Sequence, residues 1–223
     1  MLNLNKESFS KLPPDKQEKI LQTAIVEFAE HGFDGANINK IAEKAGVSVG
    51  SMYKYFNNKH DLYLMAVSFS VDKLKTVLNE IISSKMGFLS TVEKIIRAIQ
   101  FYSRENIYLT KLYNEMTTEN NSEFVWKIVS KMEGVTAKLY AAFIEEAQKN
   151  EQARKDMDPR YFAFFLDNLF ILLQFSYTCE YYKERLKMFI DDDVFEHDEQ
   201  LVEQLMKFIK GALFKIINVF EKS

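Results

Sequence analysis

Residues 46–56, GVSVGSMYKYF, concentrate polar groups that can bind an anion. Ser48, Tyr53, Lys54 and Tyr55 place hydroxyl, phenol and ammonium groups within about two helical turns. Groups of these types fit a catalytic loop, a phosphate-binding loop or a short helix that lies on a nucleic acid. The elements that flank the segment must decide between these three possibilities.

The charge of the chain is uneven around this segment. The net charge of the 223 residues is −3, which argues against non-specific binding of nucleic acid by the whole surface. Residues 36–60 nevertheless carry four lysines against one glutamate, whereas residues 191–199 are almost wholly acidic. The basic segment contains the GVSVGSMYKYF motif, so an anionic partner is expected there.

The composition favours a helical globular protein. Hydrophobic residues make up 47% of the chain, which is enough to build a core. Only seven glycines and three prolines occur, so few turns are available for short strands. The N-terminus lacks an apolar signal sequence, and the longest apolar run is too short to span a membrane. We therefore predict an all-α, cytoplasmic protein without membrane contact.

Two short helices are predicted on either side of a four-residue turn, Ala45–Ser48. Asn37 can cap a helix of about two turns that ends at the glycine of this turn, and the serine of the turn can cap the next helix. On the second helix, Met52 and Phe56 share one side because they are four residues apart. This arrangement is a helix-turn-helix, whose second helix enters the major groove of DNA.

The second helix has small side chains in its first turn and polar side chains after them. Small residues let a helix backbone approach the base edges, and hydroxyl and ammonium groups hold phosphates. The small residues are Val49, Gly50 and Ser51. The groups suited to phosphate are Tyr53, Lys54, Tyr55 and Lys59. The same tyrosines could instead be half-buried aromatics of a helical packing module.

Residues 20–62 resemble the N-terminal domain of the TetR/AcrR family of transcriptional regulators. The residues that match the family pattern are Ala24, Phe28, Gly32, Phe33, Ile41, Ala42, Ala45–Ser48, Gly50, Tyr53, Phe56, Lys59 and Leu62. The resemblance implies a three-helix helix-turn-helix domain in residues 1–57 and a larger helical ligand-binding and dimerisation domain in residues 58–223. Beyond the first domain, the chain resembles the family only in length and helicity.

The resemblance also implies which residues meet DNA. The positions where family members meet the groove or nearby phosphates are Asn39, Lys40, Val49, Gly50 and Ser51. The positions where they hold the DNA backbone are Tyr53, Lys54, Tyr55 and Lys59. Ala36 replaces a hydroxyl residue that is common before the second helix, which can remove a phosphate contact. Tyr55 takes a position that is often histidine and is expected to preserve one.

A dimer interface is predicted in the C-terminal part. A short recognition helix with few lysines gives modest affinity, and symmetric operators are read by dimers. The helix of residues 159–182, beginning near Asp158, is apolar over more of its circumference than one-sided packing requires. The last helix, beginning near Asp198, carries a wide apolar stripe. A four-helix interface between two copies follows, as the resemblance also implies. The alternative is that both helices pack within their own domain.

Aromatic residues beyond position 87 suggest a pocket for a small hydrophobic or aromatic effector. The candidate ligand-binding residues are Phe101, Tyr102, Tyr113, Trp126, Tyr140 and Gln174. Each aromatic residue can equally be ordinary core, and Gln174 can bridge two subunits instead.

No catalytic, cofactor or metal site is predicted. The one cysteine, Cys179, lacks a basic neighbour, and the three histidines are scattered. No Ser-His-Asp, Cys-His or paired-carboxylate arrangement is evident. The acidic run 191–198 could suggest a divalent-metal site, but such runs are usually solvated loops. We therefore expect neither an enzyme nor a cofactor.

The leading hypothesis is a ligand-responsive, homodimeric repressor that binds a palindromic operator. Its effector would prefer a conformation in which the two DNA-binding domains of the dimer are wrongly spaced, so that operator affinity falls by linkage. The alternative is a helical small-molecule-binding protein whose helix-turn-helix is vestigial or mediates protein contacts. The sequence leaves open whether the regulator represses or activates.

Overall fold

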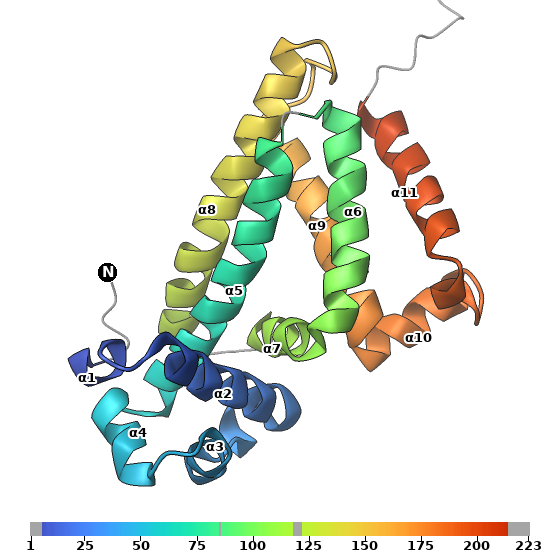
Figure 1. The fold of residues 1–223 in the computed structure, drawn as a ribbon. Helices are drawn as coiled ribbons and strands as arrows, with labels where there is room; N and C mark the ends of the chain where they lie inside the picture. The colour runs from blue at the N-terminus through green and yellow to red at the C-terminus, as the bar shows by residue number, and fades with distance from the viewer. Residues whose placement is uncertain (1–5, 85, 118–121, 214–223) are drawn as a thin grey trace, which may run out of the picture. The chain divides into compact units, whose positions relative to one another are not determined.

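The computed structural model describes residues 6–84, 86–117 and 122–213, and all their regular elements are helices (Figure 1). The all-α prediction is therefore confirmed. The chain divides into two compact units. The first unit comprises residues 1–76 and 106–132, and the second comprises residues 77–105 and 133–223. The functional boundary after residue 57 stays a prediction.

The first unit contains the predicted helix-turn-helix. Its complete helices are α1 (Glu7–Ser10), α2 (Pro14–Gly35), α3 (Ile38–Ala45), α4 (Val49–Tyr55) and α7 (Ile107–Thr117). It also holds the start of α5 (Lys59–Ser83) and of α8 (Ser122–Lys149). The second unit holds the remainder of these two helices and α6 (Phe88–Glu105), α9 (Pro159–Thr178), α10 (Glu180–Phe189), the 3-10 helix η1 (Val194–Glu196) and α11 (Asp198–Leu213).

Capping side chains set the helix starts as the sequence predicts. The Asn37 carboxamide oxygen accepts a hydrogen bond from the Asn39 backbone N–H at 2.8 Å. At the start of α9, the Asp158 carboxylate accepts one from the Arg160 N–H, also at 2.8 Å. Each bond satisfies a donor that has no partner inside its helix.

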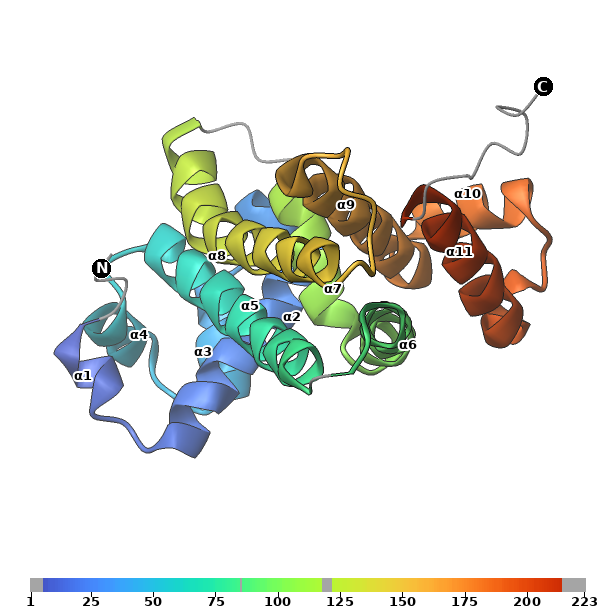
Figure 2. The same cartoon turned by 90° about the horizontal axis from the view of Figure 1, so that it is seen from above.

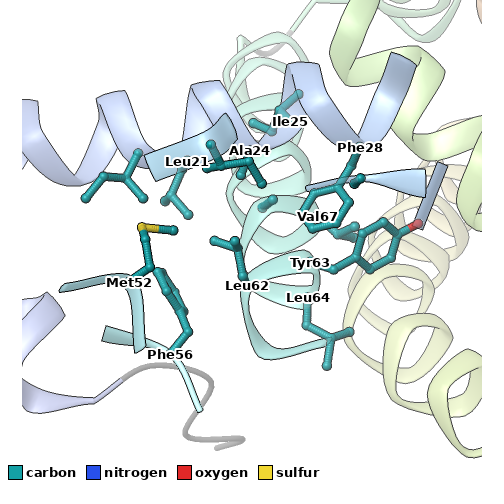
Figure 3. Close-up of a cluster of buried hydrophobic side chains, with 14 of the residues drawn as sticks. Leu21, Ala24, Ile25, Phe28, Met52, Phe56, Leu62, Tyr63, Leu64 and Val67 are labelled. Atoms are coloured by element: carbon teal, nitrogen blue, oxygen red, sulfur yellow. The ribbon is translucent and has the colours of Figure 1, made fainter. Parts of the chain in front are cut away.

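One cluster of buried apolar side chains joins α2, α3, α4 and the start of α5. Figure 3 shows Met52 of α4 and Phe56, which directly follows α4, at this cluster, with Leu21 of α2 and Leu62 of α5. Met52 is 2% exposed and Phe56 is 3% exposed. Because α4 is attached to the core by one face, its remaining surface is available to a partner.

Helix α2 is kinked at Gly32, where the backbone has φ 68° and ψ 176°. Only glycine adopts this conformation without strain. Beyond the kink, the Phe33 ring lies 4.4 Å from the His60 ring and 5.3 Å from the Tyr63 ring, measured between centroids. The glycine therefore turns the end of α2 onto the start of α5.

A polar network in the second unit ties the start of α11 to α6 and α9. The Gln100 amide donates to the Tyr177 hydroxyl at 2.9 Å, and this hydroxyl donates to the Asp198 carboxylate at 2.7 Å. The Arg104 guanidinium bonds the same carboxylate and lies 4.5 Å from the centre of the Tyr177 ring. Burial and the bond to Asp198 raise the pKa of Tyr177, so its hydroxyl keeps its proton.

The helix predicted for residues 159–182 is wrong at its end. Helix α9 stops at Thr178, Cys179 is extended with φ −107° and ψ 124°, and α10 then leaves at a bend of 104° (Figures 1 and 2). Within the described part of the chain, no single helix is long and apolar enough to cross a membrane, and α9 and α10 meet that length and composition only as a bent pair.

Candidate DNA-binding surface

The turn between α3 and α4 depends on Gly46. Its backbone lies in the left-handed region, with φ 72° and ψ 38°, and its N–H bonds the carbonyl groups at the end of α3. The following Val47 N–H donates to the Ala42 carbonyl at 2.9 Å. These bonds satisfy carbonyl groups that α3 leaves open, which is the usual helix end at a left-handed residue. The angle between the two helices therefore rests on this glycine.

A Gly46→Val substitution is expected to lower the free energy of unfolding by about 1–2 kcal/mol, the cost of a left-handed β-branched residue. Urea unfolding followed by circular dichroism would measure the loss. Gly46→Asn is the control, because asparagine tolerates this conformation and should keep most of the stability. A valine variant as stable as the wild type would contradict the strained-turn argument.

The Ser48 side chain caps the start of α4. The Ser48 hydroxyl oxygen accepts a hydrogen bond from the Ser51 N–H at 3.1 Å and lies 2.8 Å from the Ser51 hydroxyl. The cap fixes the first turn of α4, where the backbone carries only small side chains. The first turn of α4 is thus held in place although its side chains are small.

All the residues predicted to meet DNA lie on α3, on α4 or at the start of α5 in the first unit. The exposed ones are Asn39, Lys40, Val49, Gly50, Tyr53 and Lys54. The partly buried ones are Ser51, Tyr55 and Lys59. The Tyr53 side chain stands out with 52% of its surface exposed. Contact with DNA stays a prediction for each of them.

Lys59 and Tyr55 already have contacts within the first unit. The Lys59 ammonium donates to the Asp34 carbonyl at 2.9 Å and lies 4.9 Å from the centre of the Phe33 ring. The Tyr55 ring packs edge-on against Phe9, with 6.0 Å between centroids. The phosphate role implied by the family resemblance therefore rests first on the exposed Tyr53 and Lys54.

A buried carboxylate that sequence reasoning missed holds α3 against α2. Glu27 is 1% exposed, and its Oε1 accepts a hydrogen bond from the Asn37 N–H at 3.2 Å. Its Oε2 lies 3.7 Å from the Lys44 ammonium, and His31 Nδ1 lies 3.7 Å from Oε1. A buried carboxylate is costly without such partners. Since Asn37 precedes α3 and Lys44 lies in its last turn, Glu27 fixes this helix at both ends.

Lys19 adds a further ammonium group near the turn, and sequence reasoning missed this residue as well. Its Nζ lies 3.7 Å from the place that a Cβ of Gly46 would occupy. Helix α2 thereby brings positive charge to the same region as the lysines of α3 and α4. A cluster of lysines on one face is the electrostatic pattern that attracts a phosphate backbone.

The predicted ligand-binding residues are divided between the two units. Tyr113 and Trp126 belong to the first unit, and Phe101, Tyr102, Tyr140 and Gln174 belong to the second. Trp126 is 70% exposed and Phe101 is 59% exposed, whereas Tyr140 is buried with its ring 6.1 Å from Phe170. The Phe101 and Tyr102 rings contact each other at 5.3 Å. Their role in ligand binding stays a prediction.

Asp167 of α9 is a partly buried acid in the second unit that sequence reasoning also missed. Burial, and then the charge of Glu133, raise the pKa of Asp167 to about 7. Burial is likewise the main cause that raises the pKa of Tyr140, and Asp167 adds to it. Asp167 therefore titrates near neutral pH, unlike an exposed aspartate.

The acidic run near residue 191 gathers no metal ligands. In the parts of the chain that the structure describes, no group of three or more histidine, cysteine, aspartate or glutamate residues could hold a metal ion. His197 Nε2 lies 3.1 Å from the Asp193 carboxylate, a contact between residues four apart in the sequence.

The fold and this surface define the class of helix-turn-helix DNA-binding proteins with an additional helical unit. Residues 20–66 match the family model described as bacterial regulatory proteins, tetR family. This match covers the helix-turn-helix part of the chain, which is therefore similar to the TetR family of transcriptional regulators. The family resemblance inferred from the sequence is thereby confirmed.

Relatives and solved structures agree with this assignment. YhgD of Bacillus subtilis (strain 168), an uncharacterized HTH-type transcriptional regulator, is 25% identical over 167 residues, which are 75% of this chain and 86% of YhgD. IcaR of Staphylococcus aureus (strain Newman), a negative regulator of the biofilm operon icaADBC, is 24% identical over 79% of this chain and 94% of IcaR. The crystal structure of FadR from Bacillus subtilis in complex with stearoyl-CoA has a TM-score of 0.70 at 18% identity, covering 88% of this chain and 99% of FadR, and shows the shared fold.

Proposed function

We propose that the chain is a cytoplasmic, homodimeric repressor that binds a palindromic operator and is released by a small hydrophobic or aromatic effector. One observation carries the proposal: a capped recognition helix, α4, that presents small residues at its front and exposed Tyr53 and Lys54 behind them. A helix of this shape fits the major groove, because its backbone can approach the bases while the polar side chains bond phosphates.

A second copy of the chain is the proposed cover for exposed rings on α9. On one face of α9, large side chains are turned to the surface: Tyr161, Phe164, Phe165 and Leu172. The opposite face is buried in the second unit through Phe162, Leu166, Phe170 and Leu173. On α11, Phe208 is also 64% exposed. A monomer rarely leaves such a row of rings in water, which supports a dimer through α9 and α11.

The effector is proposed to be apolar over much of its surface. The aromatic side chains of the second unit favour a ligand of this kind. The neighbour FadR was crystallised with stearoyl-CoA, a ligand with a long apolar chain. An effector that binds more tightly to a conformation with wrongly spaced recognition helices lowers operator affinity. By linkage, bound operator lowers the affinity for the effector by the same factor.

Operator selection tests this function directly. Fragments bound from a random duplex pool are expected to contain two half-sites related by two-fold symmetry. Tyr53→Phe is expected to weaken binding of the selected operator about fivefold, the value of one hydrogen bond. Lys54→Ala is expected to lower the slope of log affinity against log salt by about 0.9, the signature of one lost phosphate contact.

Three outcomes would speak against the proposal. If the wild type enriches no sequence, the chain does not read DNA, and the reading as a small-molecule-binding protein gains support. If both variants bind like the wild type at several salt concentrations, DNA is held by another surface. A reporter that gains transcription when the protein binds its operator would make the regulator an activator.

A further inference from the structure

The recognition helix α4 has only seven residues, and its far end is closed by a distant segment. The last four carbonyl groups of any helix lack partners within that helix. In α4 these belong to Met52, Tyr53, Lys54 and Tyr55. The Met52 carbonyl accepts the Phe56 N–H at 2.9 Å, as in an ordinary helix end. The other three accept hydrogen bonds from residues near the N-terminus.

Lys6 and Ser8 supply all three of these bonds. The Lys6 ammonium donates to the Tyr53 carbonyl at 2.8 Å, and the Lys6 backbone N–H donates to the Tyr55 carbonyl at 2.8 Å. The Ser8 hydroxyl donates to the Lys54 carbonyl. The ammonium group also lies at the negative end of the helix dipole, where a cation is favourable. Every open carbonyl of the recognition helix is therefore satisfied.

Phe9 anchors this segment in the core of the first unit. Its side chain is fully buried, and its ring lies 4.9 Å from the Phe56 ring and 6.0 Å from the Tyr55 ring. In both views α1 lies beside α4 (Figures 1 and 2). A helix of about two turns is marginal without such support. The phenylalanine thus holds the two donor residues, Lys6 and Ser8, at the helix end.

We propose that Lys6 and Ser8 are positioning residues that brace the recognition helix from behind, so that operator affinity depends on them although neither contacts DNA. The inference rests on the proposed function of α4 in reading an operator. It assigns a role to a segment outside residues 20–66, which the family model matches.

The test compares a Lys6→Met/Ser8→Ala double variant with Lys11→Met on the selected operator. Lys11 belongs to the same segment but pairs with Glu7 on the surface at 2.6 Å, so its loss removes the same charge without touching α4. The double variant is expected to bind about tenfold more weakly, with an unchanged salt slope. Lys11→Met is expected to stay within about twofold of the wild type. A Lys6→Arg single variant should keep most of the wild-type affinity, because arginine keeps a charged donor.

Hydrogen exchange of residues 49–56 without DNA gives a second readout. The double variant is expected to exchange these amides about tenfold faster, while exchange in α9 stays unchanged. A salt slope that falls by about 0.9 for Lys6→Met alone would make Lys6 a phosphate contact and overturn the proposal. Unchanged affinity and exchange would overturn it as well. If the wild type binds no operator, the proposed function fails, and the exchange comparison alone decides whether the segment braces α4.

Discussion

A Gly50→Leu variant is expected to fold like the wild type and to bind the selected operator about 100-fold more weakly. Gly50 is exposed in α4, and among the described residues a Cβ added there meets only the Ser48 hydroxyl, at 3.9 Å. Leucine is a better helix former than glycine by about 0.8 kcal/mol, so folding is not impaired. On DNA, however, the new side chain occupies the space between the helix front and the base edges. The expected loss corresponds to one or two base contacts at about 1–3 kcal/mol each.

Fluorescence anisotropy with a labelled operator measures this affinity, and thermal unfolding measures the stability. Gly134→Leu is the matched control, because Gly134 of α8 is also exposed in a helix, and among the described residues no atom lies within 4 Å of an added Cβ. This control should leave operator binding unchanged. Equal binding by Gly50→Leu and the wild type would show that the front of α4 does not enter the groove.

An Asp167→Asn variant is expected to be more stable than the wild type at pH 8 and similar to it at pH 4. The pKa of Asp167 is raised from 3.8 to about 7 in the folded chain. Well below pH 4 both the folded and the unfolded chain hold the proton, so the substitution has little effect. As the pH rises from 4 to 7, the unfolded chain releases the proton first, and the wild type loses stability. The difference reaches about 2–4 kcal/mol above pH 7.

Urea unfolding of both proteins at pH 4, 6 and 8 measures this dependence. Glu133→Gln is an informative companion variant, because it removes the lesser cause of the pKa shift and leaves the burial of Asp167 in place. It should give only a small part of the effect. A stability difference between Asp167→Asn and the wild type that does not change with pH would contradict the raised pKa.

The features that the sequence predicts correctly depend on contacts between close neighbours in the chain. Asn37 and Ser48 cap helices through backbone groups two and three residues away, and Gly46 turns the chain by its own conformation. Such signals are legible because the interacting groups lie within one helical turn of each other. The helix-turn-helix could therefore be placed almost to the residue.

The features that the sequence does not reveal depend on partners that are distant along the chain or on burial. Lys6 and Ser8 bond carbonyl groups 47 and 46 residues further on, and backbone carbonyls carry no residue-specific signal. Glu27 looks like a surface residue of an amphipathic helix until α3 covers it. The break at Cys179 has neither glycine nor proline to mark it, and aromatic residues continue across it to Tyr182. In each case tertiary packing overrides the local pattern.

The exposed rings of α9 make the proposed regulator sensitive to its own abundance. If the operator is read only by two chains joined through these rings, then below the dissociation constant of the pair the number of active molecules grows with the square of the chain concentration. A modest fall in synthesis of the chain would then lower operator occupancy by a larger fraction than it lowers the chain concentration. A lower gene dosage would therefore act on the target promoter in the same direction as the effector, without any ligand being present.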